Sequence, residues 1–225
     1  MERKFTFSSG EYYHIYNRGV DKRTIFESAE EYRRFLMLLY LCNSNNHVDI
    51  NELLLEGRSF LDVLGVDTGN DITALGAHVL MPNHFHLLIK ETMEGGLSKF
   101  IGKVSTGYSM YFNKKHDRSG SLFQGRFQAK HIQNDEYLKY MFAYTHLNPV
   151  KLIEPNWKET GIKNKLVAQK FLNNYSYSSY FDYVGIQRLE QKILNKKAFP
   201  NYFNKAKDFN SFIFDWLSYR DNENP

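Results

Sequence analysis

Hydrophobic and polar residues along the chain follow two different periods. β-branched and aromatic residues gather in four short segments that are typical of strands: 12–17, 73–80, 84–90 and 127–132. Three longer segments keep helical spacing: 31–41, 97–113 and 135–148. Ser28 with Glu31 predicts a capping box before the first helix, and Pro149 ends the third. The order strand, helix, strand, strand, helix, strand, helix predicts an α+β fold with helices packed on a mostly antiparallel sheet.

Two parts of the chain break this pattern. Residues 43–72 are longer than the connection expected between the first helix and the second strand, and we interpret them as an insertion with a short helix within 51–64. Towards the C-terminus the periodicity weakens, apart from a terminal helix expected at 209–219. We therefore expect one domain at 1–152, which carries the insertion, and a C-terminal extension of mixed helix and loop at 153–225.

Composition narrows the class of protein only slightly. The formal charge of +4 permits a polyanionic partner without requiring one. The 16 Tyr and 18 Phe suit base stacking, and equally a small core with buried rings. The single cysteine, Cys42, excludes an intramolecular disulfide and a cysteine zinc cluster. Residues 1–5 lack the apolar stretch of a signal peptide, and the longest apolar run, 35–42, is too short to cross a bilayer, so we expect a cytoplasmic protein without a membrane partner.

The first candidate for chemistry is the histidine pair His84 and His86 in the third predicted strand. Alternate side chains of a strand face the same way, so both imidazoles project from one face while Phe85, Leu87 and Ile89 project from the other, towards a core. Two adjacent imidazoles supply two ligands of a divalent-metal site. Taken alone, a His-x-His pattern is more typical of surface histidines on a half-exposed strand than of a metal site.

The second candidate is the end of the helix at 135–148. Tyr144 and Asn148 lie one turn apart on the same helix face, so an amide oxygen and a phenol can approach one metal ion. Tyr137 and Tyr140 share roughly the same stripe, and the spacing alone does not single out one tyrosine. An aromatic stripe packed on the sheet, and an Asn that ends a helix before Pro149, remain the structural alternatives.

The two candidates together fit one reaction on DNA. A phenol has a pKa near 10 and is a poor nucleophile at neutral pH, whereas a divalent cation polarises a phosphate and stabilises its transition state. In-line attack by a tyrosine leaves a covalent phosphotyrosine that keeps the bond energy for religation.

With both features considered, the sequence resembles the HUH single-tyrosine transposases, and more narrowly the insertion-sequence-200-like and REP-associated tyrosine transposases. The resemblance is ordered along the chain, through four segments: 13–19, 79–89, 120–127 and 144–151. It is strongest in the segment that contains the histidine pair. The long insertion and the tail beyond residue 185 have no counterpart in the family pattern, and the tail can cover the site, aid dimerisation or bind DNA.

The resemblance implies roles for single residues. His84 and His86 match the metal-binding histidines, Tyr144 the nucleophile and Asn148 the third ligand. It further implies a ferredoxin-like antiparallel sheet, Mg²⁺ or Mn²⁺ as cofactor, and cleavage of single-stranded or hairpin DNA through a 5′-phosphotyrosine, followed by strand transfer. Relatives act alone or as homodimers with exchanged tyrosine helices, and a homodimer is therefore one expected state.

Basic residues near these motifs are candidates for phosphate contacts in a DNA complex. Arg18 and Arg126 are the strongest candidates because they lie inside family-like segments. The full set is Arg18, Lys22, Arg23, Lys114, Lys115, Arg118, Arg126 and Lys130. His14 and His78, on neighbouring strands, can lie near the metal, although core or hydrogen-bonding roles fit them better.

Two other functions remain open at this point. A domesticated protein can grip a hairpin without mobilising an element, and a metallohydrolase can use water in place of the tyrosine. The complete set of His84, His86, Tyr144 and Asn148 favours the enzyme, a DNA-cleaving and DNA-joining transposase.

Overall fold

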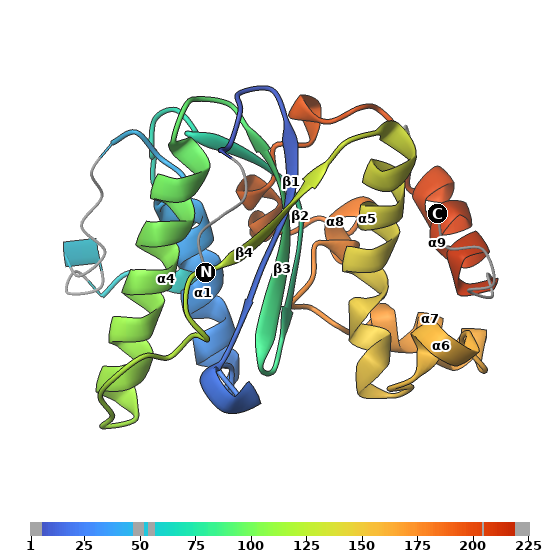
Figure 1. The fold of residues 1–225 in the computed structure, drawn as a ribbon, viewed down its shortest axis with the longest axis horizontal. Helices are drawn as coiled ribbons and strands as arrows, with labels where there is room; N and C mark the ends of the chain where they lie inside the picture. Colours follow the sequence, from blue (N-terminus) through green and yellow to red (C-terminus); the bar gives the residue numbers. More distant parts are fainter. Residues whose placement is uncertain (1–5, 47–51, 54–56, 204, 219–225) are drawn as a thin grey trace.

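The computed structural model describes residues 6–46, 52–53, 57–203 and 205–218, and its centre is a four-stranded antiparallel sheet (Figure 1). The strand order is β2-β3-β1-β4. The strands are β1 (Tyr12–Arg18), β2 (Thr73–Met81), β3 (His84–Glu91) and β4 (Gln128–Ile132). With the long helix α1 between β1 and β2 and the long helix α4 between β3 and β4, this order is the ferredoxin-like arrangement, so the predicted α+β fold is confirmed.

Two helices, α1 (Ala29–Leu41) and α4 (Gly96–Lys115), cover one face of the sheet (Figure 1). Phe85, Leu87 and Ile89 of β3 are fully buried in the core on this side, as their alternation predicted. The capping box of α1 is present, with the Ser28 backbone N–H donating to Glu31 Oε2 at 3.2 Å.

A third helix, α5 (Asp135–Leu147), lies on the opposite face (Figure 1). Its first turn is capped by Asn134, whose Oδ1 accepts a hydrogen bond from the Tyr137 backbone N–H at 2.7 Å. At its other end Asn148 is the C-cap, and a 3₁₀ turn (Asn148–Leu152) follows because Pro149 cannot continue the helix. The predicted start and stop of this helix are both confirmed.

The insertion contains the short helix α3 (Phe60–Val63), while residues 47–51 and 54–56 lie outside the described part of the chain. The C-terminal region forms four further helices: α6 (Trp157–Thr160), α7 (Lys165–Leu172), α8 (Tyr180–Tyr183) and α9 (Ala206–Ser218). The terminal helix starts three residues before its predicted start, and Tyr219 lies outside the described residues.

The C-terminal region packs on the sheet and on α5 at once. The Leu80 backbone N–H donates to Tyr177 O at 3.0 Å, and the Ser179 N–H donates to His78 O at 2.9 Å, so this segment covers the edge of β2. Phe209 and Ile213 of α9 share a hydrophobic core with the outer side of α5 (Figure 1). Among the described residues, no helix has the length and hydrophobicity that crossing a bilayer needs.

Candidate active site

The histidine pair lies on the sheet face that α5 covers. β3 directs His84 and His86 to this face, because the residues between and after them point into the opposite core. The two ring centroids are 5.0 Å apart with an interplanar angle of 87°. His86 is only 6% exposed, and His84 is half-buried. The two imidazoles therefore form one compact pair beneath the helix.

Neighbouring side chains fix the orientation of both rings. His84 Nδ1 lies 2.6 Å from Asn83 Oδ1, and because that oxygen only accepts, the His84 proton sits on Nδ1 and Nε2 keeps its lone pair. His86 Nδ1 lies 2.8 Å from His14 Nε2, so this buried pair shares one hydrogen bond. When His86 donates in that bond, its Nε2 is likewise available to a cation, which is the usual way a second residue orients a metal-binding histidine.

The histidines of the site are held in the neutral form. Burial, with smaller contributions from the nearby charges of Lys151 and Arg18, lowers the pKa of His84 to about 4. Burial also lowers the pKa of His86 well below its ordinary value. The pKa of His14 falls to about 3, first through burial and then through the charges of Lys130 and Lys158. Neutral imidazoles are the form that binds a metal ion.

Asn148 supplies a buried amide beside the pair. Its side chain lies close enough to His84 to raise the pKa of that ring against the effect of burial. The residue is fully buried, yet neither Oδ1 nor Nδ2 makes a hydrogen bond within the described part of the chain. An unsatisfied buried amide costs about 1–3 kcal/mol, so the position calls for a further partner.

Two neutral imidazoles and this amide oxygen fit a divalent cation as the missing partner. The described residues contain no cluster of three or more His, Cys, Asp or Glu side chains arranged for a metal. The candidate ligand set differs from such a cluster because its third member is a side-chain amide, which is not one of these four residue types.

Tyr144 stands over the histidines from one turn earlier in α5. Its ring lies edge-on to His86, with centroids 5.3 Å apart, and to His14 at 5.8 Å. Tyr137, Tyr140 and Tyr144 stack in sequence along the helix, with centroids 6.0 and 6.1 Å apart. Tyr144 is the member of this stripe at the histidine end, which the sequence spacing alone did not decide.

A cavity of about 280 Å³ opens beside the ring of Tyr144. Strands β1, β3 and β4, helix α5 and the short helix α6 all contribute to its lining. The lining residues are His14, Tyr16, His86, Lys130, Tyr137, Tyr140, Met141, Tyr144 and Lys158. Polar, aromatic and cationic groups thus surround one space next to a phenol.

Two of the predicted DNA contacts, Arg18 and Lys130, lie near this cavity. Lys130 lines it, and the charge of Arg18 reaches His84. Arg18 is exposed at the end of β1, donates a hydrogen bond from Nε to Gln124 Oε1, and lines an adjacent cavity of about 400 Å³. Lys130 and Arg18 thus lie close to the histidines of the site.

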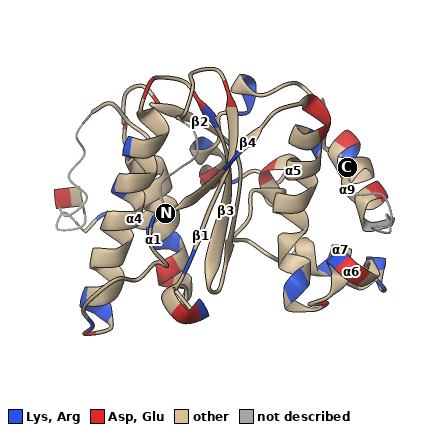
Figure 2. Ribbon diagram, in the orientation of Figure 1, with Lys and Arg blue, Asp and Glu red and all other residues tan. Residues whose placement is uncertain are grey.

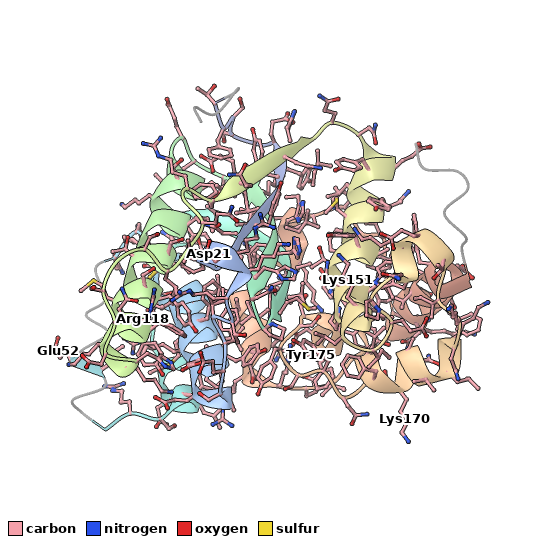
Figure 3. The ribbon with its side chains drawn as sticks, turned by 60° about the horizontal axis from the view of Figure 1, so that its bottom comes forward. Asp21, Glu52, Arg118, Lys151, Lys170 and Tyr175 are labelled. Atoms are coloured by element: carbon pink, nitrogen blue, oxygen red, sulfur yellow. The ribbon has the colours of Figure 1, made fainter. Side chains whose placement is uncertain are left out.

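The other predicted contacts lie elsewhere or have protein partners. Lys115 pairs with Glu30 at 2.8 Å, and Arg118 donates to Asn113 Oδ1 at 2.6 Å. Both belong to the α4 side of the molecule, and Figure 3 shows Arg118 far from Lys151. Four are exposed: Lys22, Arg23, Lys114 and Arg126. Their DNA contacts stay predictions.

Two cations at the site were not predicted from the sequence. Lys151 follows α5 directly, and its charge reaches His84 and His86. Lys158 belongs to α6 and lines the cavity, and none of the segments that resemble the family contains it. Figure 2 shows Lys and Arg around α6 and α7 as well as at the lower end of α4. Lys151 directly follows the Asn-Pro-Val segment, and this position could have identified it from the sequence. Lys158 had no such signal.

Known proteins resemble this chain in part of its sequence and in its fold. Residues 65–148 match the family model described as "Transposase IS200 like". Among solved structures the chain resembles a REP-associated tyrosine transposase bound to a REP hairpin, with a TM-score of 0.50 and 14% identity, over 84% of this chain and 90% of that chain. A tRNA(His) guanylyltransferase from Saccharomyces cerevisiae aligns with 100% of this chain and 85% of its own at 11% identity, but its TM-score of 0.33 is too low to indicate a shared fold. No curated protein matches.

The fold and the site define an α+β protein whose ferredoxin-like sheet carries a paired histidine motif beneath a tyrosine-bearing helix. The match of residues 65–148 to the IS200-like transposase model confirms the resemblance found in the motifs of this segment. The matched segment runs from just before β2 to Asn148 and so contains the histidine pair and Tyr144.

Proposed function

We propose that this protein is a metal-dependent enzyme that cuts and rejoins single-stranded DNA through a 5′-phosphotyrosine on Tyr144. The observation that carries the proposal is the position of the Tyr144 ring, 5.3 Å from that of His86, on the helix that ends in the unsatisfied amide of Asn148. The match of residues 65–148 to the IS200-like transposase model supports a DNA-processing reaction at these residues. The geometry supports a tyrosine as the group that reacts.

His84, His86 and Asn148 would hold Mg²⁺ or Mn²⁺, which when bound supplies Lewis-acid stabilisation of the phosphate. Tyr144 Oη forms a bond to phosphorus, the bond from phosphorus to the 3′-oxygen breaks, and that oxygen leaves as a 3′-hydroxyl after taking up a proton. The phenol proton goes to solvent. Reversal by another 3′-hydroxyl releases Tyr144 and joins the strands, so no nucleoside triphosphate is needed.

The substrate we propose is single-stranded DNA that carries a hairpin. The solved transposase that this chain resembles in fold is bound to a REP hairpin. Arg18 and Lys130 near the cavity would contact backbone phosphates and make binding depend on salt concentration. The cytoplasmic location and the homodimer expected from the sequence stay predictions.

A covalent-capture experiment tests this function. The protein is mixed with Mn²⁺ and a library of DNA hairpins with randomised single-stranded flanks, and denaturing gels detect protein joined to DNA. We expect a covalent adduct with the 5′ end of the DNA fragment that lies on the 3′ side of the cut, lost in Tyr144→Phe and retained in Tyr137→Phe, which removes a hydroxyl from the same stripe.

Two other outcomes would each indicate a different activity. Hairpin binding without any adduct, in Mn²⁺ and in Mg²⁺, would indicate a hairpin-binding protein that does not cleave. Cleavage that survives in Tyr144→Phe would indicate a metallohydrolase that uses water. Either result contradicts the proposal.

A further inference from the structure

The C-terminal region places a cation directly against the proposed nucleophile. Lys158, in α6, has its Nζ 3.9 Å from the centroid of the Tyr144 ring. The lysine is half-buried and lines the cavity beside that ring. Its charge also reaches His14 and His86. The ammonium group therefore lies among the reacting residues, although it comes from outside the segment that the family model matches.

The position of α6 follows from how the chain turns after α5. The 3₁₀ turn at Asn148–Leu152 reverses the chain, and α6 then lies beside the C-terminal half of α5. Trp157 and Lys158 form a small apolar pocket with Tyr144, Leu147 and Trp216. This packing holds the lysine stem and directs the ammonium group towards the phenol.

An ammonium group at this place has two physical effects. Over the face of an aromatic ring it is attracted by the ring quadrupole, which restrains the ring in one orientation. A phosphate under attack lies about 3–3.5 Å from the attacking oxygen, so a cation next to the phenol is also close to the phosphate oxygens. Lysine binds phosphate as a compact point charge.

A second ammonium group lines the same cavity. Lys130, on β4, is exposed and also lines the cavity, and its charge reaches His14. Two cations from distant parts of the sequence thus meet one space next to Tyr144. That arrangement is complementary to a phosphodiester, whose charge increases in the transition state.

We propose that Lys158 is a catalytic residue that contacts the scissile phosphodiester and also holds the Tyr144 ring in its attacking orientation, so that the C-terminal region completes the active site. This inference rests on the proposed function. Lys158 keeps its proton throughout: it forms and breaks no covalent bond, and it balances the negative charge that develops on phosphorus oxygens while Tyr144 attacks and the 3′-oxygen leaves.

The test compares variants in single-turnover cleavage of a captured hairpin substrate. Lys158→Met keeps the aliphatic stem and removes the charge, and we expect the cleavage rate to fall about 10- to 100-fold, the range of one hydrogen bond to a charged group. Lys158→Arg restores a cation, and we expect it to recover most of the rate. Hairpin affinity changes little in either variant, because most of the binding comes from other cations.

Lys170→Met is the matched control. It makes the same substitution in α7, on an exposed side chain that Figure 3 shows pointing away from the body of the molecule. We expect its cleavage rate to equal that of the unchanged protein. Thermal unfolding of all variants shows whether a slow variant is merely less folded.

Three results would overturn the inference. Lys158→Met could cleave at the full rate, Lys158→Met and Lys158→Arg could be equally slow, or the loss of rate could follow a loss of thermal stability in both. The proposed function has its own failure, cleavage by Tyr144→Phe. An inert Tyr144→Phe next to a fully active Lys158→Met would reject only the role of Lys158.

Discussion

At the scale of single residues, the site depends on side chains whose hydrogen bonds are incomplete or shared. His84 is oriented by its sequence neighbour Asn83, and His86 by His14 on the adjacent strand. Asn148 lies near His84, but neither polar atom of its amide makes a hydrogen bond within the described residues. A residue that is buried without its hydrogen bonds lowers stability unless function requires it, and this contrast is a basis for a measurement.

Asn148→Ala should separate stability from metal binding. In EDTA the variant should be as stable as the unchanged protein or more so, because about 1–3 kcal/mol of unsatisfied amide is removed and offsets the lost packing. In Mn²⁺ the unchanged protein should show a rise in melting temperature that the variant lacks. Thr145→Val is the control: it removes another unsatisfied buried polar group of α5 and should keep the Mn²⁺ effect. A variant that unfolds readily in EDTA yet keeps the full Mn²⁺ effect would contradict the assignment.

The low pKa values of the histidines predict acid sensitivity in the metal-free protein. Burial sets the folded-state pKa of His84 to about 4 and that of His14 to about 3, below the unfolded value of about 6.5. Between these values the unfolded chain binds more protons, so stability is fully present above about pH 6.5 and falls as the pH is lowered towards the folded-state values. The loss is at most about 1.4 kcal/mol per pH unit for each ring.

Urea unfolding in EDTA at about pH 7 and about pH 5 measures this effect. We expect a smaller unfolding free energy at the lower pH and a weaker pH dependence in His14→Gln. Equal or greater stability at the lower pH would show that these rings are not held neutral in the fold.

At the scale of elements, the sequence predicted most of the frame. The strands and the three long helices begin and end within about two residues of their expected positions, because alternation and helical spacing report directly on burial. The same periodicity put His84 and His86 on one face and Tyr144 and Asn148 on one helix side. Periodicity does not report which elements meet, so the contact between β3 and α5 came from the family resemblance.

The C-terminal elements could not be placed from sequence, because their positions depend on non-local contacts. Phe199 packs against Gly76, where the β2 to β3 register shifts, and neither residue has a local pattern that reveals the other. A Cβ at Gly76 would lie 2.5 Å from the Phe199 ring. Because Gly76 has no side chain, the Phe199 ring of the C-terminal region can pack directly against the sheet.

Gly76→Val should loosen this packing. The added side chain must displace the Phe199 ring, and we expect a loss of about 1–3 kcal/mol in unfolding free energy, the usual cost of overpacking a core. Gly102→Ala is the control, because its Cβ would meet nothing within 4 Å in α4, and it should leave stability unchanged or increase it. Urea unfolding of both variants measures the difference. A Gly76→Val protein as stable as the control would show that Phe199 is not held there.

At the scale of the whole molecule, one buried ion pair ties the C-terminal region together. Arg188 Nε donates to Asp182 Oδ1 at 2.9 Å, and its Nη1 donates to Ser176 O at 2.7 Å. The Asp182 side chain is fully buried and that of Arg188 is 11% exposed. This cluster fixes the segment that covers the edge of β2, and so supports the sheet that carries the histidines.

Arg188→Met should destabilise the protein strongly. It leaves the Asp182 carboxylate buried without its cation, which typically costs about 3–5 kcal/mol. Lys139→Met breaks the exposed pair with Asp135, at 2.8 Å, and should cost less than about 0.5 kcal/mol. Chemical denaturation compares the two directly. Similar losses in both variants would mean that the buried Arg188–Asp182 pair contributes no more to stability than the exposed Lys139–Asp135 pair.

One consequence follows from the fact that β3 and α5 belong to the same polypeptide. His84, His86, Asn148 and Tyr144 lie together within one chain. If they perform the proposed reaction, we expect that dilution leaves the activity per molecule unchanged. Mixing inactive Tyr144→Phe with inactive His86→Ala should not regenerate activity, since neither copy lends the other its missing part. Recovery of cleavage in that mixture would show that one copy supplies Tyr144 to the histidines of another copy.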